Sequence, residues 1–341
     1  MRIWAARRWG AVAAVSALLV LVGIASPAAA CACGVIATEG DAKATFTGER
    51  AIINWDGENQ QIDLSLAMAS DAATAGLVFP TPNPARVSAG DPERFEYLEE
   101  QIAPRPIVVN DWWGFGVEGE TVVDTEPVVL DRVRVGELEA TTLRASNVSG
   151  LNKWLKSNDF TLSKGNRESL ATYVDLGWSF VAVKLVAGDT LDGRLDPIRF
   201  TFETDELIYP IRASSVTSNP QDIRLYIFDD HRASLRQFEK SNRPVNASQT
   251  VVWAGNVEGS EVADSGAYLT VFDLHLDNPK KQVRSDIVIV DALADDEVIP
   301  TVTRSNPISL LGIPVGILVV GWIAFGVVLV LSYIVGRFRS H

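Results

Sequence analysis

Residues 50–68, RAIINWDGENQQIDLSLAM, carry the pattern that decides the fold. Asp56-Gly57 is a tight-turn dipeptide between two runs of strand-forming residues. After this turn, apolar and small or polar residues alternate, which is typical of a strand that buries one face. The apolar set is Ile62, Leu64, Leu66 and Met68, and between its members lie Asp63, Ser65 and Ala67. We therefore predict a β-hairpin with one buried face.

Segments on either side of the hairpin extend the pattern. Asp91-Pro92 is typical of a helix start, a second helical pattern begins near Ser149, and a third covers about residues 167–176 before Gly177. Residues 78–85, with proline at alternate positions, are expected to form an edge strand or a protected connection. Strand patterns follow at residues 178–186, 195–204, 222–230, 267–276 and 285–293. The fold class predicted is α+β: a strand-rich extracytoplasmic domain, of one or two lobes, with a few short helices.

The amino-terminal end has the features of a secretory signal peptide over residues 1–30. Arginines precede an uncharged apolar run, and Ala28 and Ala30 satisfy the small-residue rule for signal peptidase. Cleavage there would make Cys31 the first residue of the mature chain. Acylation of Cys31 is the alternative, although a lipoprotein site normally has a larger aliphatic residue where this chain has Ala28.

The carboxy-terminal end is predicted to cross a membrane. Residues 308–335 contain no charged side chain and are long enough to span the hydrocarbon core as a helix. The basic tail, residues 336–341, is expected in the cytoplasm by the positive-inside rule. The organisation predicted is therefore an extracytoplasmic domain at 31–300, a stalk at 301–307 and a single-pass anchor in the cell membrane, with the amino terminus outside.

Gly312 and Gly316 have the spacing of a helix-dimer motif, but Pro314 lies between them, and we expect no dimer there.

Charge excludes one class of partner. The chain has 30 Lys and Arg against 43 Asp and Glu, and the acidic residues all lie between the two apolar ends. Such a polyanionic surface disfavours nucleic acid. The expected partners are the lipid bilayer, through the carboxy-terminal helix, and an unknown envelope protein or glycan.

Several linked segments resemble one bacterial family. They are ERAIINWDGENQQIDLSLAM (49–68), LVFPTPNP (77–84), WLKSNDFTL (154–162), YVDLGWSFVAVKL (173–185) and LDPIRFTFETDELIYPIR (195–212). In this order they are similar to the family called domain of unknown function 2330, and the similarity extends to about Asp230. The resemblance implies export, cysteines near the mature amino terminus and, in many members, a carboxy-terminal membrane segment. It implies no assigned activity.

Catalytic and metal-binding patterns are missing from the sequence. There is no nucleophile elbow, phosphate-binding glycine loop or His-Glu-x-x-His motif. His231 and His275 lack a partner at metal-ligand spacing, so we expect both to be structural. The acidic clusters at 229–230 and 295–297 lack the pattern of a calcium loop and are expected to be turns. We predict no catalytic residue, no metal site and no cofactor.

Two stretches remain as candidate sites. Cys31 and Cys33 are the only cysteines, and export favours a disulfide between them that staples the amino terminus. In NDWWGFG, Trp112, Trp113 and Phe115 form an aromatic loop whose two tryptophans are hard to bury together. We expect this loop to contact a partner at the membrane-distal surface, and the alternative is a loop that folds back on the core. The function predicted is a non-catalytic binding module, and the alternative is a surface thiol-disulfide oxidoreductase that uses the Cys-x-Cys pair.

Overall fold

The predicted hairpin is the centre of the larger of two packed sheets. In the computed structural model, β2 (Ala44–Trp55) pairs antiparallel with β3 (Asn59–Ser70), and the carboxylate of Asp56 accepts the backbone N–H groups of Glu58 and Asn59 in the turn. Gly57 has a φ of 95°, which favours glycine at this position. The structure describes residues 33–38, 44–113, 132–133, 139–144, 147–158, 160–186, 190–237, 248–257 and 268–339.

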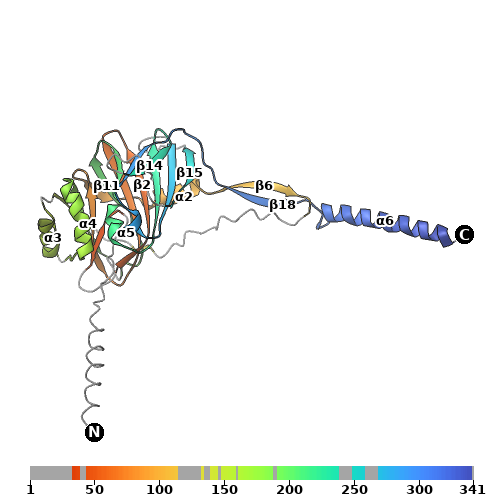
Figure 1. The fold of residues 1–341 in the computed structure, drawn as a ribbon, viewed down its shortest axis with the longest axis horizontal. Helices are drawn as coiled ribbons and strands as arrows, with labels where there is room; N and C mark the ends of the chain where they lie inside the picture. Colours follow the sequence, from red (N-terminus) through yellow and green to blue (C-terminus); the bar gives the residue numbers. More distant parts are fainter. Residues whose placement is uncertain are drawn as a thin grey trace, which may run out of the picture.

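In the described part of the chain, nine strands make up this larger sheet. Strands β2, β11 and β15 are labelled in Figure 1. Its order is β15-β16-β13-β2-β3-β10-β7, and β11 pairs with both β3 and β5. The added strands are β5 (Arg86–Ala89), β7 (Arg132–Val133), β10 (Gly193–Leu195), β11 (Ile198–Glu203), β13 (Gln221–Asp229), β15 (Ser248–Asn256) and β16 (Tyr268–Leu276). The strand patterns at 195–204, 222–230 and 267–276 are thereby confirmed.

The smaller sheet packs against the larger one. Its order is β1-β4-β9-β8, formed by β1 (Val35–Thr38), β4 (Thr74–Thr81), β9 (Ser179–Val186) and β8 (Glu139–Arg144). Phe79 of this sheet stacks on Phe200 of the larger sheet, with ring centroids 4.2 Å apart, and both rings are fully buried. One hydrophobic cluster therefore joins the two sheets. Pro80 lies where β4 pairs only with β9, because β1 ends its pairing at Val78, and proline is tolerated at positions with one neighbouring strand.

Helices cover the outer faces of both sheets. On the smaller sheet lie α3 (Val148–Ser157) and α4 (Lys164–Asp175), and on the larger sheet lies α2 (Pro92–Gln101). The predicted start of α2 is confirmed, since the Asp91 carboxylate accepts the N–H of Glu93 at 2.9 Å. Gly177 follows α4 with a φ of 75°.

Short elements complete the body. Strands β12 (Leu207–Tyr209), β14 (Ala233–Gln237) and β17 (Ile287–Asp291) form a third sheet, and a 3-10 turn at Arg212–Val216 and α5 (Pro279–Gln282) lie outside the sheets.

The prediction that the hairpin buries one face is wrong, because α2 covers the second face. Asp63 and Ser65, expected at the surface, are 0% and 1% exposed. The Asp63 carboxylate accepts hydrogen bonds from Arg94 Nη1 at 2.9 Å and from Arg199 Nε and Nη2 at 2.7 and 2.8 Å. A period of two reports which residues share a face, but it does not report whether another layer covers that face.

A two-stranded ribbon connects the body to a long helix (Figure 1). Strand β6 (Arg105–Asp111) pairs in parallel with β18 (Thr301–Pro307), so the residues predicted to be a stalk form a strand. The short pair β19 (Ser309–Leu310) and β20 (Ile313–Pro314) follows, and α6 (Val315–Arg339) then runs away from the body. The helix begins at Val315 rather than Ile308, because Leu311 and Gly312 have positive φ values that a right-handed helix cannot include. Among the described residues, Val315–Arg337 is the one helix long and apolar enough to cross a membrane.

We predict that Asp63→Asn lowers the free energy of unfolding by about 3–5 kcal/mol, because the nearly buried Arg94 guanidinium would lose its carboxylate partner. Urea unfolding of the full-length protein in detergent, followed by circular dichroism, measures this change. Asp205→Asn is the matched control at an exposed position, and it should change the free energy by less than about 0.5 kcal/mol. Equal midpoints for the two variants would contradict the role given to Asp63.

Candidate functional site

Cys33, one of the two predicted disulfide residues, lies in the core between the sheets. Its side chain is fully buried and within hydrogen-bonding reach of the Tyr209 hydroxyl, which donates to the Glu49 carboxylate. Burial, followed by the neighbouring Cys33 and Glu49, raises the pKa of Tyr209 well above its ordinary value. Cys31 lies outside the described residues, and its pairing with Cys33 therefore stays a prediction.

The environment of Cys33 bears on the oxidoreductase alternative. Reactive thiols need access to solvent and nearby positive charge to stabilise the thiolate. Cys33 has no exposed surface. The polar groups near it, the phenol of Tyr209 and the carboxylate of Glu49, carry no positive charge. This arrangement favours an inert thiol or an inert disulfide over exchange chemistry.

Trp112 and Trp113, the described part of the aromatic loop, lie beside the first turn of α6. Their side chains are 56% and 48% exposed, so neither belongs to the core. The Trp112 carbonyl accepts the N–H of Gly316 at 2.7 Å. The expectation that this loop lies on the membrane-distal surface is therefore wrong, because it lies next to the predicted anchor and α3 lies at the opposite end of the body (Figure 1). Phe115 lies outside the described residues.

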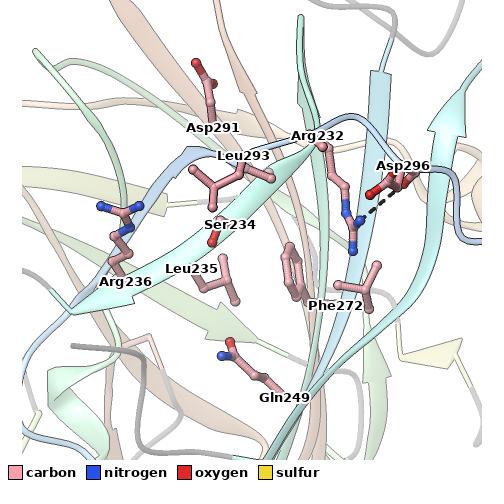
Figure 2. Close-up of a pocket in the computed structure, with 13 residues that line it drawn as sticks. Arg232, Ser234, Leu235, Arg236, Gln249, Phe272, Asp291, Leu293 and Asp296 are labelled. Carbon is pink, nitrogen blue, oxygen red and sulfur yellow. Dashed lines mark hydrogen bonds between the residues drawn. The ribbon is translucent and has the colours of Figure 1, made fainter. Parts of the chain in front are cut away.

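A cavity of about 510 Å³ opens on the side of the body. Its walls come from β14, from β15 and β16, and from the segment that follows β17 (Figure 2). That segment is fixed at both ends: the Ala292 N–H donates to the Arg232 carbonyl at 2.7 Å, and Ala254 and Val298 exchange two backbone hydrogen bonds of 2.8 Å. The cavity is thus bounded by strands and by a fastened connection.

The cavity combines donors, acceptors and apolar surface. Its polar lining comprises Arg232, Ser234, Arg236, Gln249, Asp291 and Asp296, and its apolar lining includes Leu235, Val251, Phe272 and Leu293. Arg232 Nη1 donates to the Asp296 carbonyl at 3.3 Å (Figure 2), while its buried Nε has no hydrogen-bond partner among the described residues. The Leu293 side chain is fully exposed at the rim. Linings that combine apolar surface with a few polar groups are typical of ligand-binding and active sites.

The two acidic clusters meet at one edge of this cavity. His231 Nδ1 lies 2.9 Å from Asp295 Oδ2, and the backbone N–H of Arg232 donates to Asp295 Oδ1 at 2.8 Å. The hydrogen bond to Asp295 raises the pKa of His231, and the same bond lowers the pKa of Asp295. Within the described ranges, no group of three His, Cys, Asp or Glu side chains is placed to hold a metal ion.

His275 is paired in the same way on β16. Its Nδ1 lies 2.6 Å from Asp222 Oδ1 and its Nε2 lies 3.2 Å from Asp277 Oδ1. The hydrogen bond to Asp222 is the main cause of the raised pKa of His275. Each histidine thus contacts a carboxylate on a neighbouring segment, and a structural role for both stays a prediction.

Sequence patterns could not have located the cavity. Its lining comes from segments around residues 232–236, 249–251, 272 and 291–296, which meet only after the third sheet packs beside the larger one. The only sequence signal was the presence of acidic turn residues at 229–230 and 295–297, and their contact is a tertiary one.

The chain belongs to a bacterial protein family. The family model described as an uncharacterized protein conserved in bacteria (DUF2330) matches residues 27–289. The match confirms the resemblance seen in the sequence and extends it past Asp230 into β17. The family description assigns no activity.

Other comparisons add little about function. No curated protein matches the chain. The crystal structure of baculovirus P35 is similar at 12% sequence identity with a TM-score of 0.36, and the alignment covers 77% of this chain and 98% of that chain. A similarity at this level supports no functional inference.

We predict that Asp295→Asn lowers the pKa of His231 toward its ordinary value of 6.5 and leaves His275 unchanged. In the parent protein the ion pair of His231 and Asp295 contributes fully to stability when the pH is below 6.5, the ordinary pKa of histidine. This contribution to stability is lost as the pH rises through the raised pKa of His231 in the folded protein. Imidazole NMR titration measures both histidines. Asp222→Asn is the matched control and should shift His275 alone; a shift of neither histidine would contradict the pairing.

A second prediction concerns Cys33. In the folded protein an alkylating reagent should not modify it, because its side chain has no exposed surface. If the predicted disulfide is present, modification should require both unfolding and reduction. Intact mass after alkylation, with and without urea and reductant, tests this, and rapid alkylation of the folded protein would instead support the oxidoreductase alternative.

Proposed function

We propose that this member of the family is an exported, single-pass envelope protein whose body binds a partner outside the cytoplasmic membrane without catalysing a reaction. The signal-like residues 1–30, the apolar α6 and the basic residues at its carboxy-terminal end support this topology. The bilayer is then one partner, through α6. The second partner binds the body.

The cavity beside β14 carries the proposal. Among the described strands, β14 pairs only with β17, and β15 lies at the end of the nine-stranded sheet. The Ala233 N–H points away from β17, since it donates to Thr270 Oγ1 at 2.9 Å. Antiparallel pairing alternates along a strand, so the peptide groups of Leu235 point to the same side. A strand edge that borders a cavity is the usual docking place for an extended polypeptide.

An extended segment of an envelope protein therefore fits the site better than a glycan. Sugar rings pack well on exposed aromatic faces. Phe272 is the aromatic residue among the described residues of the lining, and only 4% of its surface is exposed. The exposed Leu293 and the guanidinium of Arg236 instead offer an apolar anchor and a hydrogen-bond donor at the rim.

Photo-crosslinking in the native envelope tests this assignment. With p-benzoylphenylalanine in place of Leu293, we expect one discrete adduct, in which the crosslinked peptide of the partner is identified by mass spectrometry. Arg236→Ala in this background should reduce the adduct roughly fivefold or more, as expected for a rim residue worth at least about 1 kcal/mol.

The matched control places the same crosslinker at Lys156, an exposed position on α3 at the other end of the body. Equal adducts from both positions would reject the cavity as the binding site. A glycan adduct at position 293 would reject the polypeptide partner.

A further inference from the structure

Exposed apolar side chains lie next to the first turn of α6. Trp112 and Trp113 lie close to Gly316 in that turn, and the turn between β19 and β20 directly precedes the helix. We call Trp112, Trp113, Leu310, Leu311 and Ile313 the apolar collar; their exposed fractions range from 43% for Ile313 to 96% for Leu311. This much apolar surface in one place is rare on a protein that faces only water.

Backbone hydrogen bonds fasten the collar to both the ribbon and the helix. The Asp111 carbonyl accepts the N–H of Ile308 at 2.9 Å, and the Ile308 carbonyl accepts the N–H of Val315 at 2.9 Å. The Trp112 carbonyl accepts the N–H of Gly316 at 2.7 Å. The ribbon and α6 are therefore joined by a chain of bonds, not by a free linker.

Gly316 is needed for this junction. A Cβ at this position would lie 2.7 Å from both the Trp112 carbonyl oxygen and the ring of Trp113. Gly312 has a φ of 79° in the turn before the helix. Both glycines thus have roles within the chain, which accounts for their spacing without a helix dimer.

Leu311 has a backbone conformation that is unfavourable for its side chain. Its φ is 55°, in the left-handed region where Gly or Asn is usual. Its side chain is 96% exposed and is therefore not packed on the body. A leucine at such a position is explained if its side chain is buried by something outside the chain.

We propose that the apolar collar lies in the interfacial layer of the bilayer that α6 crosses, with the two tryptophans at headgroup depth and Leu311 directed toward the acyl chains. Tryptophan is enriched at this depth because its ring is apolar and its N–H is polar. Residues 308–335 contain no charged side chain to oppose insertion. The inference rests on the membrane anchor of the proposed function, and it adds that lipid contact fixes how the ribbon and body stand on the membrane.

Depth-dependent fluorescence quenching tests the collar in the full-length protein, reconstituted into phosphatidylcholine nanodiscs. Lipids brominated near the headgroup should quench tryptophan emission in the parent protein. In the Trp112→Phe/Trp113→Phe variant this shallow quenching should fall about twofold or more, because the two interfacial rings are gone. Trp154→Phe, on α3, is the matched control and should leave it unchanged.

A second variant keeps the test independent of tryptophan replacement. Leu311→Asn retains a residue that tolerates positive φ and removes the apolar side chain. It should reduce shallow quenching of the native tryptophans, whereas Leu176→Asn, at an exposed leucine on the body, should not.

The outcomes separate this inference from the anchor on which it rests. Trp322 lies within α6, so lipids brominated deep in the acyl chains should quench its emission, and Trp322→Phe should abolish that signal. Deep quenching with unaltered shallow quenching in the Trp112→Phe/Trp113→Phe and Leu311→Asn variants would overturn the collar alone. Absence of deep quenching in the parent protein would overturn the anchor and the collar with it.

Discussion

The buried carboxylate of Asp63 is the constraint on which the layered body depends. A carboxylate without solvent is unfavourable by several kcal/mol unless charged donors surround it. Here the donors come from two other elements, Arg94 of α2 and Arg199 of β11, at 2.7–2.9 Å. Strand β3 is therefore stable in its place only when α2 covers one face of the sheet and β11 lies alongside. The same strand presents Leu64 to the opposite face, where the smaller sheet closes the core.

The two-stranded ribbon of β6 and β18 connects this body to α6. Parallel two-stranded ribbons are marginal in isolation, so their ends need support. At the body the Arg105 N–H donates to the Pro300 carbonyl at 2.9 Å, and at the far end Trp112 accepts from Gly316. The cavity beside β14 lies on the body (Figures 1 and 2), while the apolar collar lies next to the first turn of α6. Partner binding and lipid contact are thus assigned to separate parts of one connected structure.

Local sequence patterns predicted many of the elements. The predictions that failed have a common cause, because each depended on contacts between residues distant in the chain. The turn at Asp56-Gly57, the start of α2 at Asp91 and the end of α4 before Gly177 are confirmed because each depends on a few neighbouring residues. The second buried face of the hairpin was missed, since α2 supplies it from elsewhere in the chain. The tryptophan loop was placed at the wrong end, because its position is set by pairing of residues 105–111 with 301–307. The binding roles of both candidate surfaces remain predictions.

The sequence by itself determined the family, the strand-rich class and the apolar carboxy-terminal helix. These follow from motif order, from alternation and from uninterrupted hydropathy, which are properties of contiguous residues. Tertiary structure alone decided that β6 pairs with β18, that His231 meets Asp295 and that the lining of the cavity converges from four segments. Such contacts join residues distant in the chain, and their free energy comes from sheet pairing and packing, which no local pattern encodes.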